Sequence, residues 1–236
     1  MYRKKFFIFV IILFSLAACK GNAANTARIM SIFAIEGDTV NLIHDNGSEF
    51  VAREGTNLFE GNAVSTGILS YCFIALDSDA LVKMDEQSLF SVEKVSEKLL
   101  SLKIERGQIL MDIKRQAPDL NNAFEIRAGN LMLGTRGTLF IVGLNDDDSV
   151  YVIMLEGATE TDTGEIFPAG TMTKIFDDEK NTTAIVIEEL DIFALQAIWD
   201  YKGRALEAGA VTPAQLVTVE QLLELYGTPP VVVQNF

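Results

Sequence analysis

The sequence predicts a mainly β fold followed by a C-terminal α-helical hairpin. Short apolar runs rich in β-branched and aromatic residues recur from residue 29 to about residue 187. Glycine, asparagine and aspartate separate these runs every several positions, as turn residues do. From residue 188 onward, turn residues become fewer and apolar residues recur at helical spacing. We expect the β part to be a roll or sandwich, or a solenoid-like stack of short strands.

The start of the chain has the pattern of a targeting signal. Residues 3–5 are basic, and residues 6–16 form an apolar run that is too short to span a bilayer comfortably. The small residues Ala17 and Ala18 follow, directly before Cys19. A charged start, a short apolar run and small residues at a cleavage point define a secretory signal.

A cysteine directly after such small residues resembles the lipobox of bacterial lipoproteins, in which the cysteine is diacylated and becomes the new N-terminus. The resemblance implies that residues 1–18 are a removable lipoprotein signal peptide and that Cys19 is the site of lipid attachment. Residues 19–28 would then form a lipidated tether. An ordinary signal with an incidental cysteine, and an uncleaved anchor, are the alternatives.

The β part, residues 29–187, divides into strands and turns. The Asp45-Asn46-Gly47 segment predicts a hairpin with a type I′ turn, because Asn-Gly accepts positive φ angles. Segments 77–79 and 162–164 fit turns of the same kind. Strands are expected over residues 33–35, 40–43, 73–76, 81–84, 109–113, 124–126, 139–142 and 150–155.

A weak internal repeat is visible within these strands. Residues 34–56 contain a strand, a Glu-Gly break, a hairpin turn and an Ala-x-x-Gly-Thr ending, and residues 154–171 repeat this order with an Ala-Gly-Thr ending. Glycines at such spacing are typical of bends where a strand turns a corner.

The C-terminal segment, residues 188–236, predicts two helices joined through residues 203–211. The first has helically spaced apolar residues between residues 188 and 203. The second opens with a capping box at residues 212–215, with Pro213 at its first position, and ends at Gly227. We expect their apolar stripe to dock on the β-domain, with docking on a partner as the alternative.

The charge of the chain argues against nucleic-acid binding. The sequence has 19 basic and 33 acidic residues, for a net charge of −14. Removing the three basic residues of the signal leaves 16 basic residues against 33 acidic ones, a net charge of −17. Such a surface repels phosphate backbones and gains nothing from counterion release.

The side chains that most often carry catalysis are few. Cys72 lies in an apolar run and is expected to be a small buried hydrophobe, because a reactive thiol needs an exposed, electropositive setting. His44, the single histidine, lies beside the predicted turn and is expected to be a surface residue. A Ser-His-Asp triad would need it near a serine elbow, and the sequence contains no Gly-x-Ser-x-Gly. We expect no catalytic residue and no cofactor.

The densest carboxylate run is Asp146, Asp147 and Asp148. Carboxylates are ligands for hard cations such as calcium, but the run lacks the glycine and distal glutamate of an EF-hand loop. A solvated hairpin loop between two strands is the preferred interpretation, and no metal site is predicted. Paired carboxylates for glycoside hydrolysis are not marked by any neighbouring motif.

The segment LMLGTRGTLFIV, residues 131–142, has two glycines and Arg136 between apolar runs. A phosphate-binding P-loop needs a Gly-Lys-Ser/Thr ending that leads into a helix, whereas Gly137 is followed by a strand-forming run. A Gly-x-x-Gly nucleic-acid loop needs a basic, helix-flanked setting. We therefore predict a bend between two strands, in which Arg136 binds backbone carbonyls or a nearby carboxylate.

Taken in order, these motifs resemble the FecR domain of bacterial envelope proteins. The resemblance covers about residues 30–175 and is carried by segments 61–70, 73–84, 104–112, 124–126 and 137–142 and by the Leu-Glu-Gly at 155–157. The positions that match the family signature, expected to be structural, are Gly61, Gly107, Gly134, Arg136, Gly137, Thr138, Phe140 and Gly157.

The resemblance implies a non-catalytic extracytoplasmic β-module. In its best-known architecture the family regulates a sigma factor through a cytoplasmic segment and a transmembrane helix. This chain instead begins with a lipoprotein signal, so we do not expect it to hold a cytoplasmic sigma factor directly. We expect a protein anchored by lipid in the bacterial cell envelope (periplasm or outer membrane) that binds an envelope protein partner as a sensory or scaffolding module. A module that binds cell-wall glycan or another envelope polymer is the alternative.

Replacement of Cys19 tests the anchor. We expect Cys19→Ala to move the protein out of the membrane fraction and to abolish labelling with a fatty-acid analogue, because no acyl chain can attach. Cys72→Ala is the matched control and should stay lipid-labelled and membrane-bound. A Cys19→Ala protein that remains labelled in the membrane would contradict the lipoprotein interpretation.

Overall fold

The computed structural model describes residues 28–77, 80–114, 123–135, 137–177, 179–186 and 189–198. As predicted, the fold is mainly β, with a short helix over residues 192–198 near the C-terminal end of the described chain. The second predicted helix lies outside the described residues. The strands are β1 (Met30–Glu36), β2 (Val40–Ile43), β3 (Glu49–Val51), β4 (Asn57–Leu58), β5 (Ala63–Thr66), β6 (Tyr71–Leu76), β7 (Ala80–Met84), β8 (Leu89–Val95), β9 (Leu99–Ile113), β10 (Ala123–Ala128), β11 (Leu131–Thr135), β12 (Leu139–Leu144), β13 (Val150–Glu156), β14 (Ala158–Thr161), β15 (Ile166–Pro168), β16 (Thr171–Phe176) and β17 (Glu179–Ala184).

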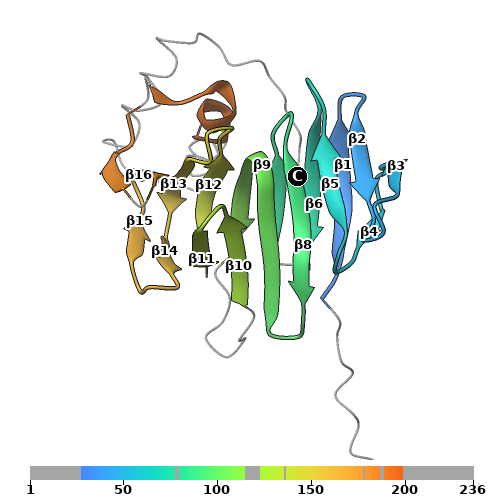
Figure 1. The fold of residues 1–236 in the computed structure, drawn as a ribbon, viewed down its shortest axis with the longest axis horizontal. Helices are drawn as coiled ribbons and strands as arrows, with labels where there is room; N and C mark the ends of the chain where they lie inside the picture. Colours follow the sequence, from blue (N-terminus) through green and yellow to red (C-terminus); the bar gives the residue numbers. More distant parts are fainter. Residues whose placement is uncertain are drawn as a thin grey trace, which may run out of the picture.

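The strands form two layers, which we name sheet A and sheet B (Figure 1). Sheet A has the order β4-β1-β6-β7-β9-β12-β13-β16-β17 and is antiparallel throughout. Sheet B has the order β3-β2-β5-β8-β9-β10-β11-β14-β15, with one parallel pair, β9 and β10. Strand β9 belongs to both sheets, because its first half pairs in sheet B and its second half in sheet A.

The chain turns repeatedly from one sheet to the other at glycine corners. The internal repeat of the sequence corresponds to two copies of one strand arrangement that includes such corners. In each copy a hairpin in sheet B, β2–β3 or β14–β15, is flanked by two strands that pair in sheet A, β1–β4 or β13–β16. Equivalent hydrogen bonds close the two copies, from the Gly55 N–H to the Ile32 carbonyl and from the Gly170 N–H to the Met154 carbonyl. The copies form opposite edges of the molecule.

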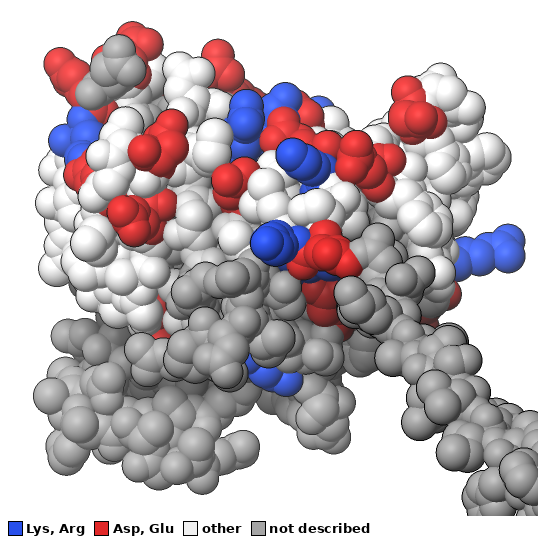
Figure 2. Space-filling view, turned by 90° about the horizontal axis from the view of Figure 1, so that it is seen from below, with Lys and Arg blue, Asp and Glu red and all other residues white. Residues whose placement is uncertain are grey.

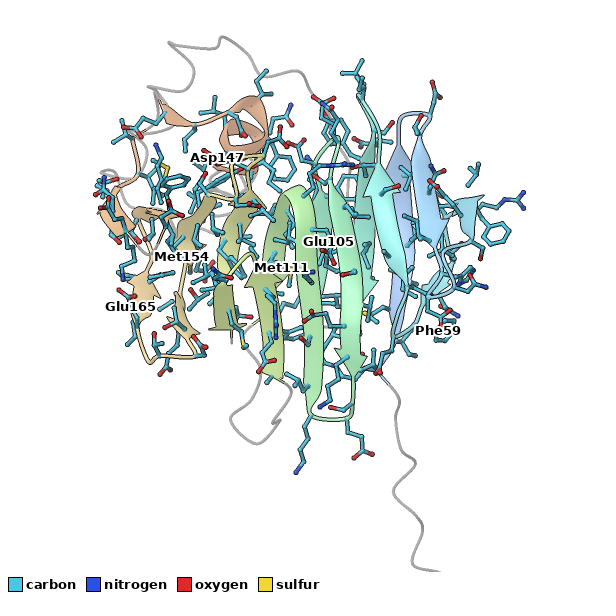
Figure 3. The ribbon with its side chains drawn as sticks, viewed as in Figure 1. Phe59, Glu105, Met111, Asp147, Met154 and Glu165 are labelled. Carbon is cyan, nitrogen blue, oxygen red and sulfur yellow. The ribbon has the colours of Figure 1, made fainter. Side chains whose placement is uncertain are left out.

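The main core lies between the two sheets. Alternate side chains of the strands point inward, and the largest fully buried ones come from both layers. Met111 and Met154, labelled in Figure 3, are completely buried members of this core. The core also holds Phe90 and Phe124 from sheet B and Phe140 from sheet A.

The outer faces of the two sheets differ in character. On sheet A a second apolar cluster joins Ile141, Ile153 and Met172 to Phe193 and Ile198 of the short helix. The first predicted helix therefore docks on the β-domain, as expected. The outer face of sheet B is polar, with ion pairs between Lys103 and Glu105 and between Arg127 and Glu93. Figure 2 shows acidic and basic side chains beside one another on this side, in the upper part of the view.

The hairpin at residues 44–48 differs from the predicted type I′ turn. Gly47 has a φ of 78°, whereas Asn46 is not among the residues with positive φ. The Gly47 N–H binds the His44 carbonyl, and the His44 N–H binds the Ser48 carbonyl. This is a three-residue loop with a type I turn and a bulge glycine, which also suits the twist of the flanking strands. Residues 145–149 and 161–165 form hairpins with the same hydrogen bonds.

A partly buried ion pair ties the first described residue, Arg28, to the loop after β6. The Arg28 Nε lies 2.7 Å from the Asp77 Oδ2, and the Arg28 Nη1 donates to the Ala123 carbonyl at 3.0 Å. The guanidinium also lies 4.3 Å from the centre of the Phe124 ring, a cation–π distance. The Ile29 N–H donates to the Asp77 Oδ1 at 2.8 Å, and the Asp77 N–H donates to the Ile29 carbonyl at 2.7 Å. Arg28 thereby joins the start of β1 to both sheets.

Gly107 makes the corner of β9, and its replacement tests that role. Its φ is 77°, and an added Cβ would lie 2.7 Å from the Ser88 Cα, so a side chain meets both strain and a backbone clash. We expect Gly107→Ala to lower the free energy of unfolding by about 3 kcal/mol. Gly47→Ala is the matched control, because its φ is 78° but nothing lies within 4 Å.

The control Gly47→Ala should lower the free energy of unfolding by only about 1 kcal/mol, which is the strain of a left-handed alanine. Urea unfolding of both variants measures the difference. Equal losses would mean that the contact with Ser88 does not constrain the corner.

Candidate functional site

The positions of the FecR-like signature lie at corners and in the core. Gly61, Gly107, Gly137 and Gly157 all have positive φ angles. Gly157 also approaches the neighbouring corner closely, because an added Cβ would lie 2.6 Å from the Gly137 carbonyl oxygen. These glycines lie where the chain crosses between the sheets, so their geometry is that of a scaffold.

The other signature positions have varied surroundings. Phe140 is completely buried in the main core, and Thr138 is buried beside it. Gly134 lies inside β11 without a positive φ, opposite Glu160 of β14. Arg136 lies outside the described residues, so its predicted pairing stays a prediction.

His44 and Cys72 have no catalytic surroundings in the described chain. His44 is half-buried, its Nδ1 lies 3.3 Å from the Asn62 amide nitrogen, and its ring meets the Phe50 ring edge-on. Cys72 is fully buried in β6, and burial raises the pKa of its thiol to about 12. At neutral pH it is therefore a protonated thiol that packs as a small apolar side chain.

The run Asp146, Asp147 and Asp148 forms the tip of the hairpin between β12 and β13. The Asp147 carboxylate accepts hydrogen bonds from the Ser149 N–H at 3.0 Å and its hydroxyl at 2.5 Å, and these bonds lower the pKa of Asp147. Asp148 takes the left-handed position that Gly47 occupies in the equivalent hairpin. Among the described residues no three His, Cys, Asp or Glu side chains gather as a metal site would require.

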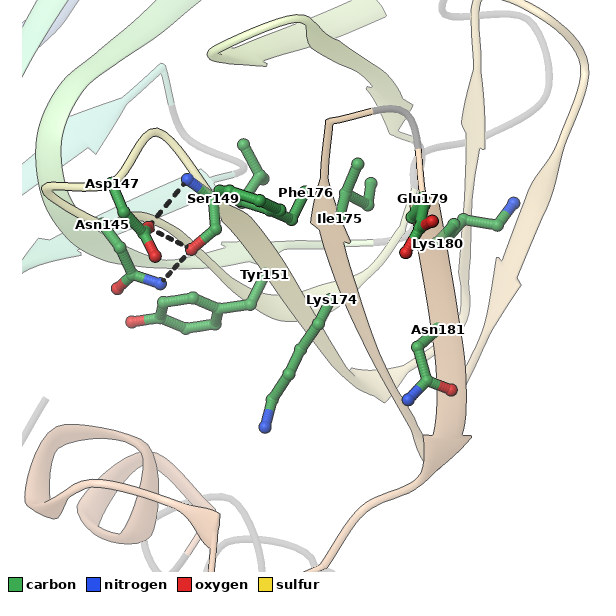
Figure 4. A pocket seen from close by; sticks show the side chains of 11 residues that line it. Asn145, Asp147, Ser149, Tyr151, Lys174, Ile175, Phe176, Glu179, Lys180 and Asn181 are labelled. Carbon is green, nitrogen blue, oxygen red and sulfur yellow. Dashed lines mark hydrogen bonds between the residues drawn. The ribbon is translucent and has the colours of Figure 1, made fainter.

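Beside this tip lies a hollow of about 420 Å³ between β13, β16 and β17 (Figure 4). Its charged side chains are largely engaged elsewhere. Lys174 binds Glu189 at 2.7 Å, Lys180 pairs with Glu165, and Asp147 closes its own turn. A second hollow of about 480 Å³ lies on β10, β11 and β14 and includes Glu125 and Glu160. In the first hollow the Ser149 hydroxyl donates to the Asp147 carboxylate, and this pair closes the hairpin turn.

A polar network on the outer face of sheet A is the most organised cluster of side chains. Its centre is Gln108, which is 7% exposed and follows the corner of β9. The Gln108 amide nitrogen donates to Asp85 at 2.7 Å and to Asp191 at 2.5 Å, and its amide oxygen accepts from the Tyr151 hydroxyl at 2.5 Å. Asp191 also accepts from the Ala194 N–H and so caps the short helix.

Strand register explains how Tyr151 reaches Gln108. Gln108 of β9 lies opposite Gly143 of β12, and Gly143 lies opposite Tyr151 of β13. The phenol ring lies over Gly143, where an added Cβ would come within 2.3 Å of the ring. The missing side chain of Gly143 therefore gives Tyr151 its path across one strand.

A lysine and several aromatic side chains also connect the short helix to sheet A. The Lys83 ammonium lies 5.6 Å from the ring centres of Tyr71 and Phe73 and 5.4 Å from that of Phe193. Such distances allow cation–π attraction. Because Phe193 belongs to the short helix, Lys83 and Gln108 together bind this helix to sheet A. The network is thus an attachment site and does not resemble a catalytic one.

In this network the charged form of the Asp85 carboxyl is destabilised. Its burial raises its pKa above the usual value, and the charges of Asp191 and Glu86 act in the same direction, against the hydrogen bond from Gln108. Burial likewise raises the pKa of Tyr151. Sequence reasoning did not identify this network, because its members come from four separate segments.

Comparison with known proteins finds a family model that matches part of this β-domain. Residues 62–160 match the family model described as FecR protein, which is less than half of the chain. The match begins just before β5 and ends within β14, so it contains the shared strand β9. This part of the chain is therefore FecR-like, in agreement with the resemblance found in the sequence. No curated protein matches the chain.

Among solved structures, the chain is similar to a protein from Parabacteroides distasonis ATCC 8503 that is provisionally assigned as an anti-sigma factor. The sequence identity is 12%, the TM-score is 0.45, and the match covers 52% of this chain and 59% of that one. A second crystal structure with the same description gives the same values. The described residues include no helix that is long and apolar enough to cross a membrane.

The raised pKa of Asp85 predicts a pH dependence. Because the folded state holds this proton more tightly than the unfolded state, stability from Asp85 is present at low pH and is lost as pH rises through its folded pKa. Asp85→Asn still accepts the hydrogen bond from Gln108 but carries no charge. We expect the variant to gain stability relative to the wild type as pH rises from 4 to 7.

Asp147→Asn is the control of opposite sign, since the pKa of Asp147 is lowered. The stability of Asp147→Asn relative to the wild type should fall as pH rises from about 2 to about 4 and should change little above that range, because both the folded and the unfolded carboxyl are then ionised. Urea unfolding at several pH values measures both differences. A difference for Asp85→Asn that does not vary with pH would show that its carboxyl is not buried as described.

Proposed function

We propose that this protein is a lipid-anchored component of the bacterial cell envelope whose FecR-like β-domain binds another envelope protein as a sensory or scaffolding module. The observation that carries the proposal is the FecR match over residues 62–160. Members of that class are typically regulators and not enzymes.

The arrangement of side chains supports a binding role. The signature glycines form corners, Cys72 is a buried thiol, and the acidic tip at residues 146–148 closes its own hairpin. The best organised polar cluster holds a helix onto sheet A. A module of this kind offers surfaces and sheet edges to a partner.

The anchor is the second part of the proposal and depends on Cys19, which lies outside the described residues. Eight residues lie between Cys19 and Arg28, the first described residue, so the two positions are nine residues apart. An extended tether of this length reaches about 30 Å. The β-domain would therefore remain close to the membrane that holds the lipid and would meet partners in or near that membrane.

Crosslinking tests the binding role. Envelope fractions that contain the full-length protein are treated with an amine-reactive crosslinker, and captured proteins are identified by mass spectrometry. We expect one discrete protein adduct that survives digestion of the cell wall with muramidase. An adduct that disappears on muramidase digestion would instead favour the glycan-binding alternative, and the absence of any adduct would contradict protein binding.

A further inference from the structure

The two sheets end in four strands that pair on one side only within the described chain: β3, β4, β15 and β17. Natural proteins protect such edges with charges, proline or short strands. Strand β4 has two residues, β15 ends in Pro168, and β17 carries Glu179 and Lys180. Strand β3 also has only three residues, but two of them, Phe50 and Val51, are apolar and exposed, whereas β15 carries one such residue, Ile166.

The backbone of β3 presents free hydrogen-bonding groups to this edge. The Ala52 N–H binds the Val40 carbonyl, and the His44 N–H binds the Ser48 carbonyl. In an antiparallel ladder the bonded pairs alternate, so Phe50 bonds to Leu42 of β2. The N–H and C=O groups of Glu49 and Val51 therefore point away from β2, toward the open side.

Apolar side chains line the same edge. Phe50 lies opposite Leu42 and shares its inward-facing side, yet it is 56% exposed because the two sheets do not close over it. Its ring meets His44, which contacts Asn62, which in turn accepts the Phe59 N–H at 3.1 Å. Phe59 is 64% exposed and lies at the far right of Figure 3, beside β3 and β4.

The charges around this edge are mainly acidic. Within residues 45–55, which contain β3, the acidic side chains are Asp45, Glu49 and Glu54 and the basic one is Arg53. Glu49 lies on the outer side of sheet B, where it accepts a hydrogen bond from Asn41. In Figure 2 the right-hand end of the molecule, where β3 and β4 lie, is otherwise largely uncharged.

The geometry points to β3 as a docking edge for an extended segment of a protein partner with alternating apolar and basic side chains. The segment adds a strand to sheet B through the Glu49 and Val51 backbone. Its inward side chains cover Phe50 and Phe59, and its outward basic side chains face Glu49. The inference rests on the proposed protein-binding function and assigns that binding to the β3 edge.

A second copy of the chain fits this edge poorly. Two β3 edges would bring the acidic groups of both molecules together, and the chain already carries a net charge of −14. The edge precedes the FecR match, which starts at residue 62, so it belongs to the part of this chain outside the matched family region.

A synthetic peptide tests the edge. The fluorescent peptide KVKVKVK is titrated with full-length protein in detergent, and binding is followed by anisotropy. We expect binding that Val51→Pro weakens on the order of tenfold or more, because proline removes an N–H that the ladder does not use. Phe50→Ser should weaken it similarly by removing the apolar contact.

Phe176→Ser is the matched control, since Phe176 is 51% exposed beside the opposite edge. It should bind like the wild type. The block peptide KKVVVKK and the acidic peptide EVEVEVE should bind less than KVKVKVK, and circular dichroism checks that each variant is folded. The inference is overturned if KVKVKVK does not bind, or if Val51→Pro and Phe50→Ser both bind it like the wild type.

Two further measurements separate this inference from the proposed function. Analytical ultracentrifugation that shows a dimer dissociated by Val51→Pro would assign the edge to a second copy and overturn the inference. In the crosslinking experiment, equal capture of a partner by the wild type and by Val51→Pro would leave protein binding in place and reject this edge. Peptide binding without any captured partner would support the edge and contradict the proposed function.

Discussion

The structure depends on one strand that belongs to both sheets. β9 pairs with β8 and β10 in sheet B and with β7 and β12 in sheet A, and it changes sheet at Gly107. Its side chains enter the common core on both sides of that corner, and Ser88 fills the space that a side chain at residue 107 would need. Because the two layers are covalently continuous here, neither can shift against the other without breaking the ladder of β9. The outer attachment of the short helix begins one residue later, at Gln108.

Much of the β-domain could be predicted from local pattern. The strand at residues 139–142 is a continuous apolar run because both of its faces are buried, by the main core and by the short helix, and residues 109–113 are apolar except for the half-buried Asp112. β17 could not be predicted in this way, since every residue of Glu179–Ala184 is exposed and only its pairing with β16 makes it a strand. The prediction of a type I′ turn at residues 45–47 was wrong for a different reason. Asn-Gly suits two hairpin geometries, and the pairing of His44 with Ser48 selects the longer loop.

The candidate site was less accessible to sequence reasoning. Gln108, Tyr151 and Asp191 are ordinary polar residues in their local sequences, and the register of three strands brings the first two together. A glycine opposite a tyrosine in neighbouring strands was the available signal, but it has meaning only when the pairing is known. The apolar edge at Phe50 and Phe59 could not be predicted from the sequence either, because a strand pattern does not show which strand will lack a neighbour. The glycine positions were easier to recognise, since their role depends on local backbone geometry.

The ion pair between Arg28 and Asp77 also has a mechanical consequence. It fixes the chain at the start of β1, and β1 pairs with β6 over most of its length. A pull on the N-terminal segment along the strand direction loads these hydrogen bonds together in shear, so that they must fail nearly at once. Arg28 adds contacts to Ala123 and Phe124 of β10, which distribute the load to the second sheet. A domain pulled at this end is therefore suited to resist tension that is applied along β1.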